Sequence, residues 1–519
     1  MRIQTIVIAG SLSLLSACQS LDAPAPEANQ SQSINPIAAA VTIEKPETSA
    51  KVEVVEITDV WERIRLGLAL PVPEQKLVKQ YREWYIKHPQ HLARVSERAT
   101  PFLYLIVEEI EKRDLPIELA LLPIVESAFD PFAYSHGAAS GLWQFTSPMA
   151  KHFGLQMNWW YDGRRDVPAA TVAALDMLEY LYKKTDGNWL YAIAAYNTGE
   201  GRVRNAVKRN KRNGKPTDFW SLDLPTETER YVPQLLALAD VIQNAEKYGI
   251  KLSPIDNEPN IEVVNVKGQI DLALAAGFAN MTTSELHKLN PGYNRWSTAP
   301  EGPHNLVLPV DRVLGFNLAL ADTDAKERLN WERYKIKSGD SLGLIAQRYR
   351  TTPSALRAVN DIKGNTIIAG KHLLIPVAAK NPDQYALSLG QRQISKQNVK
   401  RGSQKITYQV RSGDSLWKIA KTHKVKVSQL ASWNSMAPKD QLKIGQKLAI
   451  WTGSSKQSSS AITRKVNYTV RSGDSLARIA SKFKVRINDL VRWNSLEKSK
   501  YIQPGQKLQL YVDVTKVQA

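Results

Sequence analysis

A threefold repeat in the C-terminal half constrains the fold of this chain more than any other feature. The copies read "YKIKSGDSLGLIAQRYRTTPSALRAVN", "YQVRSGDSLWKIAKTHKVKVSQLASWN" and "YTVRSGDSLARIASKFKVRINDLVRWN", and they start at Tyr334, Tyr408 and Tyr468. The closing Asn lies 22 positions after the Ser of each Ser-Gly-Asp, and an apolar segment follows a Gly-Lys or Gly-Gln turn. This pattern predicts strand, two short helices and strand, with the Asp of the turn capping the first helix.

A fourth, degenerate copy precedes these three. The segment "DLALAAGFANMTTSELHKLNPG" starts at Asp271 and aligns with the first repeat when both are counted back from the closing Asn. It lacks Ser-Gly-Asp, and "HNLVLPV" supplies its closing strand. The expected modules are therefore 261–315, 332–378, 406–452 and 466–512, and the polar stretches 379–405 and 453–465 are expected to be linkers.

The repeats resemble LysM modules, and the resemblance covers each unit from end to end. It implies small α+β modules that bind glycans containing N-acetylglucosamine, such as peptidoglycan. A purely structural array is the alternative reading. The degenerate copy is expected to share the fold, and the loss of its Ser-Gly-Asp leaves glycan binding there open.

The amino terminus indicates an exported, anchored protein. Residues 1–17 combine one positive charge, a short apolar run and small residues, which is typical of a secretion signal and too short to span a bilayer. "LSAC" resembles a bacterial lipobox, which implies lipidation of Cys18, the single cysteine. Gln19 follows, which favours the outer membrane, facing the periplasm. Residues 18–57 are rich in Ala, Pro, Ser, Gln and Glu and are expected to be a flexible tether.

Positive charge is concentrated at the other end of the chain. From Gln391 onward there are 26 Lys and Arg against 6 Asp and Glu, a net charge of +20, whereas the whole chain carries +19. Such a patch can bind nucleic acid. An exported lipoprotein rarely meets nucleic acid, so an anionic surface polymer is the expected partner.

One carboxylate stands in an apolar stretch. In "LLPIVESAFDP", residues 121–131, Glu126 is the only ionisable residue before the Asp, and the pattern predicts a buried helix that starts near Asp114, its expected cap. A structural role is common for a helical Glu. An apolar pocket, however, raises the pKa of a carboxyl group and lets it donate a proton near neutral pH.

The motifs around Glu126 resemble those of family 1 lytic transglycosylases. They are "ESAFDPFAYSHGAASGLWQF" at 126–145, "AYNTGEGRV" at 195–203 and "ETERYVPQLLAL" at 227–238. The resemblance covers about 95–250 and implies a mainly helical, lysozyme-like domain over 58–252. The fold class is thus multidomain: this helical domain followed by βααβ modules.

The resemblance assigns roles residue by residue. Glu126 is the catalytic acid and base, and Ser127 orients its carboxyl or a sugar substituent. Gly141 permits a close turn, and Gln144 lines the glycan groove next to Trp143, an expected apolar groove residue. Tyr196, Asn197 and Tyr231 complete the substrate site.

The implied reaction cleaves the β-1,4 bond between MurNAc and GlcNAc and leaves 1,6-anhydro-MurNAc ends. It needs no cofactor and no metal, and one carboxylate suffices where ordinary glycosidases use two. Two alternatives stay open: a muramidase-type hydrolase on the same fold, and an inactive wall-binding lipoprotein.

Overall fold

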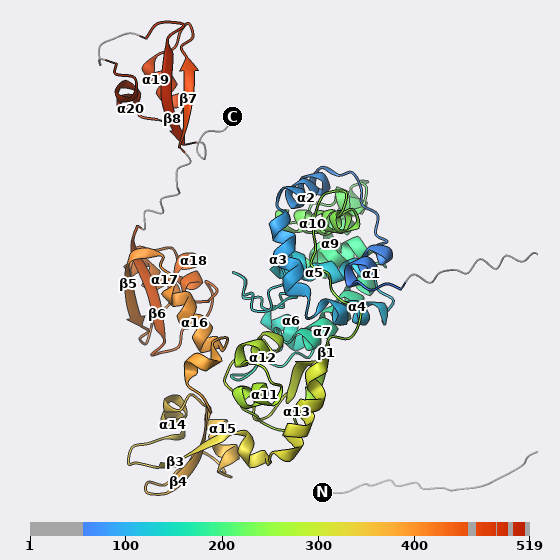
Figure 1. Cartoon of the computed structure of the whole chain (residues 1–519), viewed down its shortest axis with the longest axis vertical. Coiled ribbons are helices and arrows are strands. Elements are labelled where there is room, and N and C mark those ends of the chain that lie inside the picture. The colour runs from blue at the N-terminus through green and yellow to red at the C-terminus, as the bar shows by residue number, and fades with distance from the viewer. Residues whose placement is uncertain (1–55, 455–462, 484, 497–501, 514–519) are drawn as a thin grey trace, which may run out of the picture. The chain divides into compact units, whose positions relative to one another are not determined.

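The computed structural model describes residues 56–454, 463–483, 485–496 and 502–513 (Figure 1). The predicted signal peptide, the lipidation site Cys18, nearly all of the tether and most of the linker 453–465 lie outside the described residues. Within the described ranges, no helix has the length and apolar character that a bilayer crossing requires.

The first domain is helical. Its elements are α1 Val60–Gly67, α2 Lys76–Lys87, α3 Pro89–Ala99, α4 Leu103–Glu111, η1 Ile117–Leu121, α5 Leu122–Ser127, α6 Ser147–His152, α7 Val167–Lys184, α8 Trp189–Thr198, α9 Glu200–Arg212, η2 Phe219–Ser221 and α10 Thr226–Gln243. Both α8 and the long α10 place buried apolar side chains in one core together with α4 and α7. Ordinary helix signals explain several starts: Asp166 caps α7 and Asn188 caps α8 through side-chain hydrogen bonds.

The segment that carries Glu126 departs from the predicted helix. A short 3₁₀ helix, η1, precedes α5, and Asp114 does not cap either of them because it lies in a left-handed turn with φ 53°. Ala128 and Phe129 also have positive φ, so α5 ends one residue after the catalytic candidate. Glu118 of η1 is buried and accepts hydrogen bonds from the backbone N–H groups of Ala69 and Leu70.

The degenerate repeat has the predicted strand–helix–helix–strand order. It consists of β1 Ile261–Asn265, α11 Leu272–Phe278, α12 Thr283–Leu289 and β2 Asn305–Pro309, followed by α13 Val310–Asp322 and η3 Ala325–Arg328. The strands pair antiparallel, with Val263 opposite Val307. Helix α13 continues past residue 315, the expected end of the module, and packs Phe316 into its core.

The three intact repeats also form separate antiparallel strand pairs, each carrying two helices. Their elements are β3 Asn330–Lys335, α14 Leu342–Arg348, α15 Pro353–Val359 and β4 His372–Val377; β5 Gly402–Gln409, α17 Leu416–Thr422, α18 Val427–Trp433 and β6 Lys447–Ser454; β7 Thr463–Thr469, α19 Leu476–Lys482, α20 Ile487–Trp493 and β8 Lys507–Asp513.

The closing Asn explains the constant spacing of the repeats. In the first repeat, the Asn360 amide donates to the carbonyls of Leu356 and Leu374 and accepts from the Leu374 N–H. It therefore joins the second helix to the closing strand. Asn434 and Asn494 make the same bonds in their modules. Asn290 does so in the degenerate copy, which supports its alignment with the others.

The predicted Asp cap is wrong. The residue that caps the first helix is the Ser after it, as Ser341 shows by accepting from the Leu344 N–H. The Asp instead accepts from the hydroxyl of the Tyr that opens the repeat and from a backbone N–H of the turn, as Asp340 does with Tyr334 and Lys337. The Asp therefore holds the turn, and the Ser that follows it caps the helix.

The stretch 379–405, expected to be a linker, contains folded elements. It forms η4 Pro382–Tyr385 and α16 Leu389–Asn398. The buried Tyr385 donates its hydroxyl to Asp271 at 2.9 Å and belongs to the core of the degenerate module. The Leu389 N–H donates to the Asn294 carbonyl at 3.0 Å, so the start of α16 is attached to the same module.

Candidate active site

Glu126 lies in the last turn of α5, at the wall of a cavity of about 810 Å³. The cavity is lined by residues from α5, the loop 135–146, α8 and α10. Four of the predicted site residues, Gln144, Tyr196, Asn197 and Tyr231, line it together with Glu126. The three motif segments, which are distant in sequence, therefore meet at one cavity, as the resemblance implies.

The surroundings of Glu126 favour its protonated form near neutral pH. The pKa of Glu126 is raised from the ordinary 4.5 to about 7, mainly by burial; a hydrogen bond from Tyr231 opposes this shift, and the negative charge of Glu227 adds to it. The Tyr231 hydroxyl donates to Glu126 Oε1 at 2.5 Å. An acid with this pKa is about half protonated at pH 7, which suits general acid catalysis followed by general base catalysis.

Two tyrosines keep their hydroxyl protons in this cavity. Burial, with the charge of Glu126, raises the pKa of both Tyr196 and Tyr231 well above the usual range. Tyr231 comes from α10 and contacts the acid directly. Tyr196 comes from α8 and donates to the carbonyl of Trp143 at 2.7 Å. Next to it, the Asn197 carbonyl accepts from the Thr228 hydroxyl at 2.7 Å, which leaves the amide NH₂ for a ligand.

The turn at Gly141 requires glycine for two reasons. Its φ is +85°, and a Cβ there would lie 1.9 Å from the carbonyl oxygen of Arg164. Gln144 ends the turn with φ 49° and donates to the Gly141 carbonyl at 2.8 Å. Gly141 thus acts through the backbone, and Gln144 is the residue of this turn that reaches the cavity.

Ser127 and Trp143 take other places than expected. The Ser127 hydroxyl contacts two backbone carbonyls, those of Pro123 and Leu142, each at 3.0 Å. It therefore joins α5 to the Gly141 turn. Trp143 is fully buried and donates its indole N–H to Thr171 at 3.0 Å, so it supports the turn from the core and does not face the groove.

Glu227 is the main site residue that sequence reasoning missed. It lies in the first turn of α10 and lines the cavity, where its charge acts on Glu126. The signal was available, because Glu227 opens the same "ETERY" segment that supplies Tyr231. Tyr81, His136 and Arg230 also line the cavity, and their spacing in sequence offers no such signal.

Comparison with known families matches most of the helical domain and all four repeats. The Transglycosylase SLT domain matches residues 104–219, and the LysM domain matches 334–376, 408–451 and 468–510. The family described as "Lytic transglycosylase MltD, LysM-like domain" matches 260–325. Membrane-bound lytic murein transglycosylase D of Escherichia coli K12 is 37% identical over 387 residues, which cover 73% of this chain and 82% of that protein. The chain belongs to this transglycosylase D family.

Other similarities cover smaller parts of the chain. An autolysin of Enterococcus faecalis is 32% identical over 184 residues, 34% of this chain and 24% of that protein. Among solved structures, the lytic transglycosylase Slt of Pseudomonas aeruginosa is 25% identical, covers 30% of this chain and 25% of its own, and has a TM-score of 0.23. Family membership confirms the predicted class, a helical lysozyme-like domain followed by LysM modules.

Proposed function

We propose that this lytic transglycosylase cleaves the MurNAc–GlcNAc bond of peptidoglycan with Glu126 as its single acid and base. The observation that carries the proposal is the raised pKa of Glu126, about 7, in a cavity that also holds Tyr196, Asn197 and Tyr231. A carboxyl with an ordinary pKa would be almost wholly ionised at pH 7 and could not protonate a leaving group efficiently.

The reaction proceeds in two proton transfers. Protonated Glu126 donates to the bridging oxygen as the bond from C1 of MurNAc to that oxygen breaks, and the 2-acetamido oxygen of the same sugar forms a bond to C1. The ionised Glu126 then takes the proton of the 6-hydroxyl. The 6-oxygen attacks C1 and displaces the acetamido oxygen, which gives the 1,6-anhydro ring and consumes no water.

The neighbouring side chains fit these steps. Tyr231 donates to Glu126 and holds one carboxyl oxygen, which leaves the other free for the bridging oxygen. The Asn197 amide NH₂ is placed to orient the acetamido group. Gln144 lines the groove for the glycan. We assign Ser127 and Gly141 to positioning, because both act on the turn that carries Gln144.

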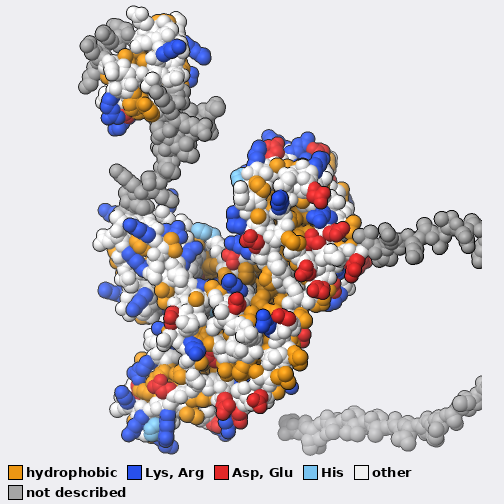
Figure 2. Space-filling model, in the orientation of Figure 1, with side chains coloured by type: hydrophobic (Ala, Val, Ile, Leu, Met, Phe, Trp, Pro, Cys, Tyr) orange, Lys and Arg blue, Asp and Glu red, His pale blue; other side chains and the backbone are white. Residues whose placement is uncertain are grey.

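The remaining parts of the chain hold the enzyme on its substrate. The LysM modules bind glycan, and the basic modules around β5 and β7, where Figure 2 shows many Lys and Arg and few acidic side chains, add attraction to an anionic wall. Lipidation of Cys18 anchors the chain, and Gln19 directs it to the outer membrane. Membrane attachment itself agrees with the family, whose E. coli member is described as membrane-bound.

Digestion of purified sacculi tests the catalytic proposal. Wild type is compared with Glu126→Gln and with the control Glu83→Gln, an exposed residue of α2. We expect anhydro-ended muropeptides from wild type and control, and an activity at least about 100-fold lower for Glu126→Gln. Reducing MurNAc ends in the wild-type digest would identify a hydrolase. Release of muropeptides by Glu126→Gln at the wild-type rate would place the acid elsewhere.

A further inference from the structure

A second cavity, of about 770 Å³, lies next to the catalytic groove. Ser135 and His136 line both cavities, so the loop that contains them forms a shared rim. The other walls are the segment 162–165, residues Asn294 and Arg295 of the degenerate module, one face of α16, and residues between 432 and 446 of the repeat that contains β5 and β6. Backbone bonds fix the first two walls together, from Asp162 N–H to Gly292 at 2.8 Å and from Asn294 N–H to Trp160 at 2.7 Å.

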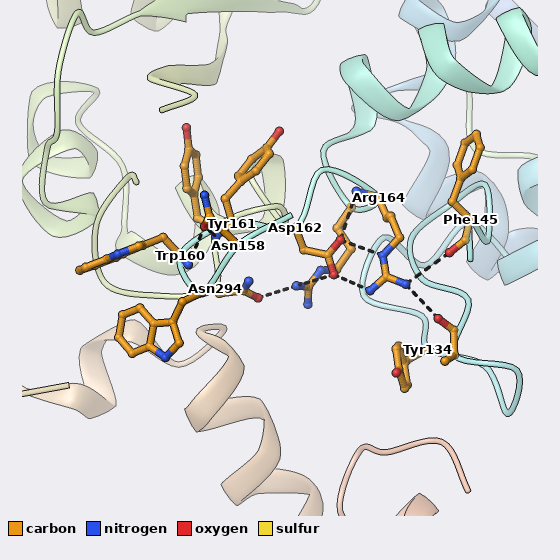
Figure 3. A network of polar contacts seen from close by, with 12 residues as sticks. Tyr134, Phe145, Asn158, Trp160, Tyr161, Asp162, Arg164 and Asn294 are labelled. Carbon is orange, nitrogen blue, oxygen red and sulfur yellow. Dashed lines mark hydrogen bonds and ion pairs between the residues drawn. The ribbon is translucent and has the colours of Figure 1, made fainter. Parts of the chain in front are cut away.

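Cations predominate in this cavity. Six Lys and Arg side chains line it, namely Arg164, Arg165, Arg295, Arg392, Lys396 and Lys443, whereas the acidic lining residues are Asp130, Asp162 and Asp440. Asp162 is buried and pairs with Arg164 at 2.8 Å and with Arg165 at 3.3 Å (Figure 3). Arg165 also donates to the Asn294 side chain. The single carboxylate of Asp162 is thus paired with the two buried guanidinium groups of Arg164 and Arg165.

Among the described residues, Arg392 and Arg295 lack a direct carboxylate partner, although the charges of Asp130 and Asp162 act on Arg392 from a distance. In the part of the chain that the structure describes, neither forms an ion pair with an acidic side chain. Arg392 projects from α16 and stacks over Phe132 at 4.5 Å, and Arg295 stacks over Trp159 at 3.7 Å. Burial and repulsion from Arg165 lower the pKa of Arg392 to about 9, against the opposing charges of Asp130 and Asp162, and lower that of Arg295 to about 10.

Hydrogen-bond donors are left over at the same place. Among the described residues, Nε of the almost fully buried Arg165 and both Nε and Nη2 of Arg392 are buried without a hydrogen-bond partner. Unpaired buried donors on charged groups are costly, and the guanidinium fork matches a carboxylate with two hydrogen bonds. A bound carboxylate would satisfy these donors and reduce the repulsion between the arginines.

We propose that this cavity binds a carboxylate of the peptide attached to MurNAc, with Arg392 as a direct ligand and Arg165 behind it. The inference rests on the proposed function, because it takes peptidoglycan as the substrate in the groove. The peptide branches from the muramyl lactyl group, so a peptide leaving the groove over Ser135 and His136 reaches the second cavity. The site recognises the negative charge of the peptide, whereas the LysM modules recognise the sugars of the glycan.

Binding of a small muropeptide tests the proposal on the full-length chain. The probe is the disaccharide GlcNAc–MurNAc carrying a tetrapeptide, which lacks a MurNAc–GlcNAc bond and is therefore not cleaved. Two further probes are the same molecule with its peptide carboxyls converted to amides and the disaccharide without peptide. Binding is measured by calorimetry for wild type, Arg392→Gln, Arg392→Lys and the control Lys400→Gln, which removes one positive charge just after α16.

We expect Arg392→Gln to weaken binding of the carboxylate probe about 10-fold or more, because a charge-assisted bidentate contact is lost. Arg392→Lys should retain part of the affinity, and Lys400→Gln should equal wild type. The amidated and peptide-free probes should bind all four proteins equally, through the LysM modules. Equal binding of carboxylate and amidated probes to wild type would overturn the proposal. The proposal would also be overturned if Arg392→Gln weakened binding of the peptide-free probe as much as it weakened binding of the carboxylate probe. Failure of the catalytic proposal would instead appear in the sacculus digest.

Discussion

The pH dependence of catalysis follows from the environment of Glu126 and can be worked out in advance. With a pKa of about 7, the fraction of Glu126 that is protonated falls from about nine tenths at pH 6 to about one tenth at pH 8. The kcat/KM for soluble glycan strands should therefore be flat below about pH 6 and fall about 10-fold between pH 6 and pH 8. A carboxyl with the ordinary pKa of 4.5 would lose about 100-fold over the same interval and show no plateau there.

The shape of the profile separates one catalytic carboxyl from two. A single group that acts as acid and then as base gives one descending limb, whereas a hydrolase with a separate ionised base gives a bell. Glu227→Gln should move the limb to lower pH because it removes a charge that raises the pKa of Glu126. The exposed Glu83→Gln should leave the limb in place. A bell-shaped profile, or a limb that Glu227→Gln does not move, would refute this reasoning. Circular dichroism across the pH range checks that the fold persists.

Three further predictions concern the site, its support and the tail. Tyr231→Phe should move the descending limb to higher pH, which is opposite to the effect of Glu227→Gln. It should also lower kcat/KM at pH 6 about 10-fold, because the hydrogen bond to Glu126 is lost. An unchanged profile would show that this hydroxyl does not act on the acid. Gly141→Ala should destabilise the helical domain by about 2–5 kcal/mol in thermal unfolding, because the new Cβ would clash with the Arg164 carbonyl and φ is positive there. The control Gly201→Ala in α9 should be neutral or stabilising, because its Cβ would have no heavy atom within 4 Å. Deleting residues 402–519 should preserve cleavage of soluble glycan but sharply reduce pelleting with sacculi, and raised salt should weaken pelleting of the intact chain only in part; complete release by moderate salt would mean that the tail acts as a polycation alone.

Sequence reasoning proposes Glu126 as the acid because two independent signals meet at this residue. Glu126 was the lone charge in an apolar stretch, and it opened a recognised set of motifs. The same reasoning failed for Ser127 and Trp143, because a position next to a site residue in the sequence does not determine where the side chain points. α5 ends immediately after Ser127 in two residues with positive φ, and this turn directs the serine hydroxyl to the backbone of Leu142.

The repeats were predictable in order and period, and less so in detail. Their period is set by one side chain, the closing Asn, whose bonds to helix and strand admit little variation in length. Asp and Ser are both good helix caps, so composition alone could not decide which of the two capped the first helix. The stretch 379–405 was predicted to be a linker because its residues are mostly polar. Its Tyr385 nevertheless packs into the core beside Asp271, and a contact between residues so distant in sequence cannot be predicted from a local pattern. The second cavity depends on such contacts throughout.

The backbone bonds between the Trp160–Asp162 segment and the Gly292–Asn294 segment have a consequence for protein engineering. They make the degenerate repeat a fixed part of the enzyme's own wall, unlike a glycan-binding module attached by a tether. A chimaera that transplants only the stretch matched to the SLT domain would leave Tyr161 and Arg165 without Tyr293 and Asn294. The smallest portable unit is therefore the catalytic domain together with the degenerate module and the helix α16, whose first residue is bonded to that module.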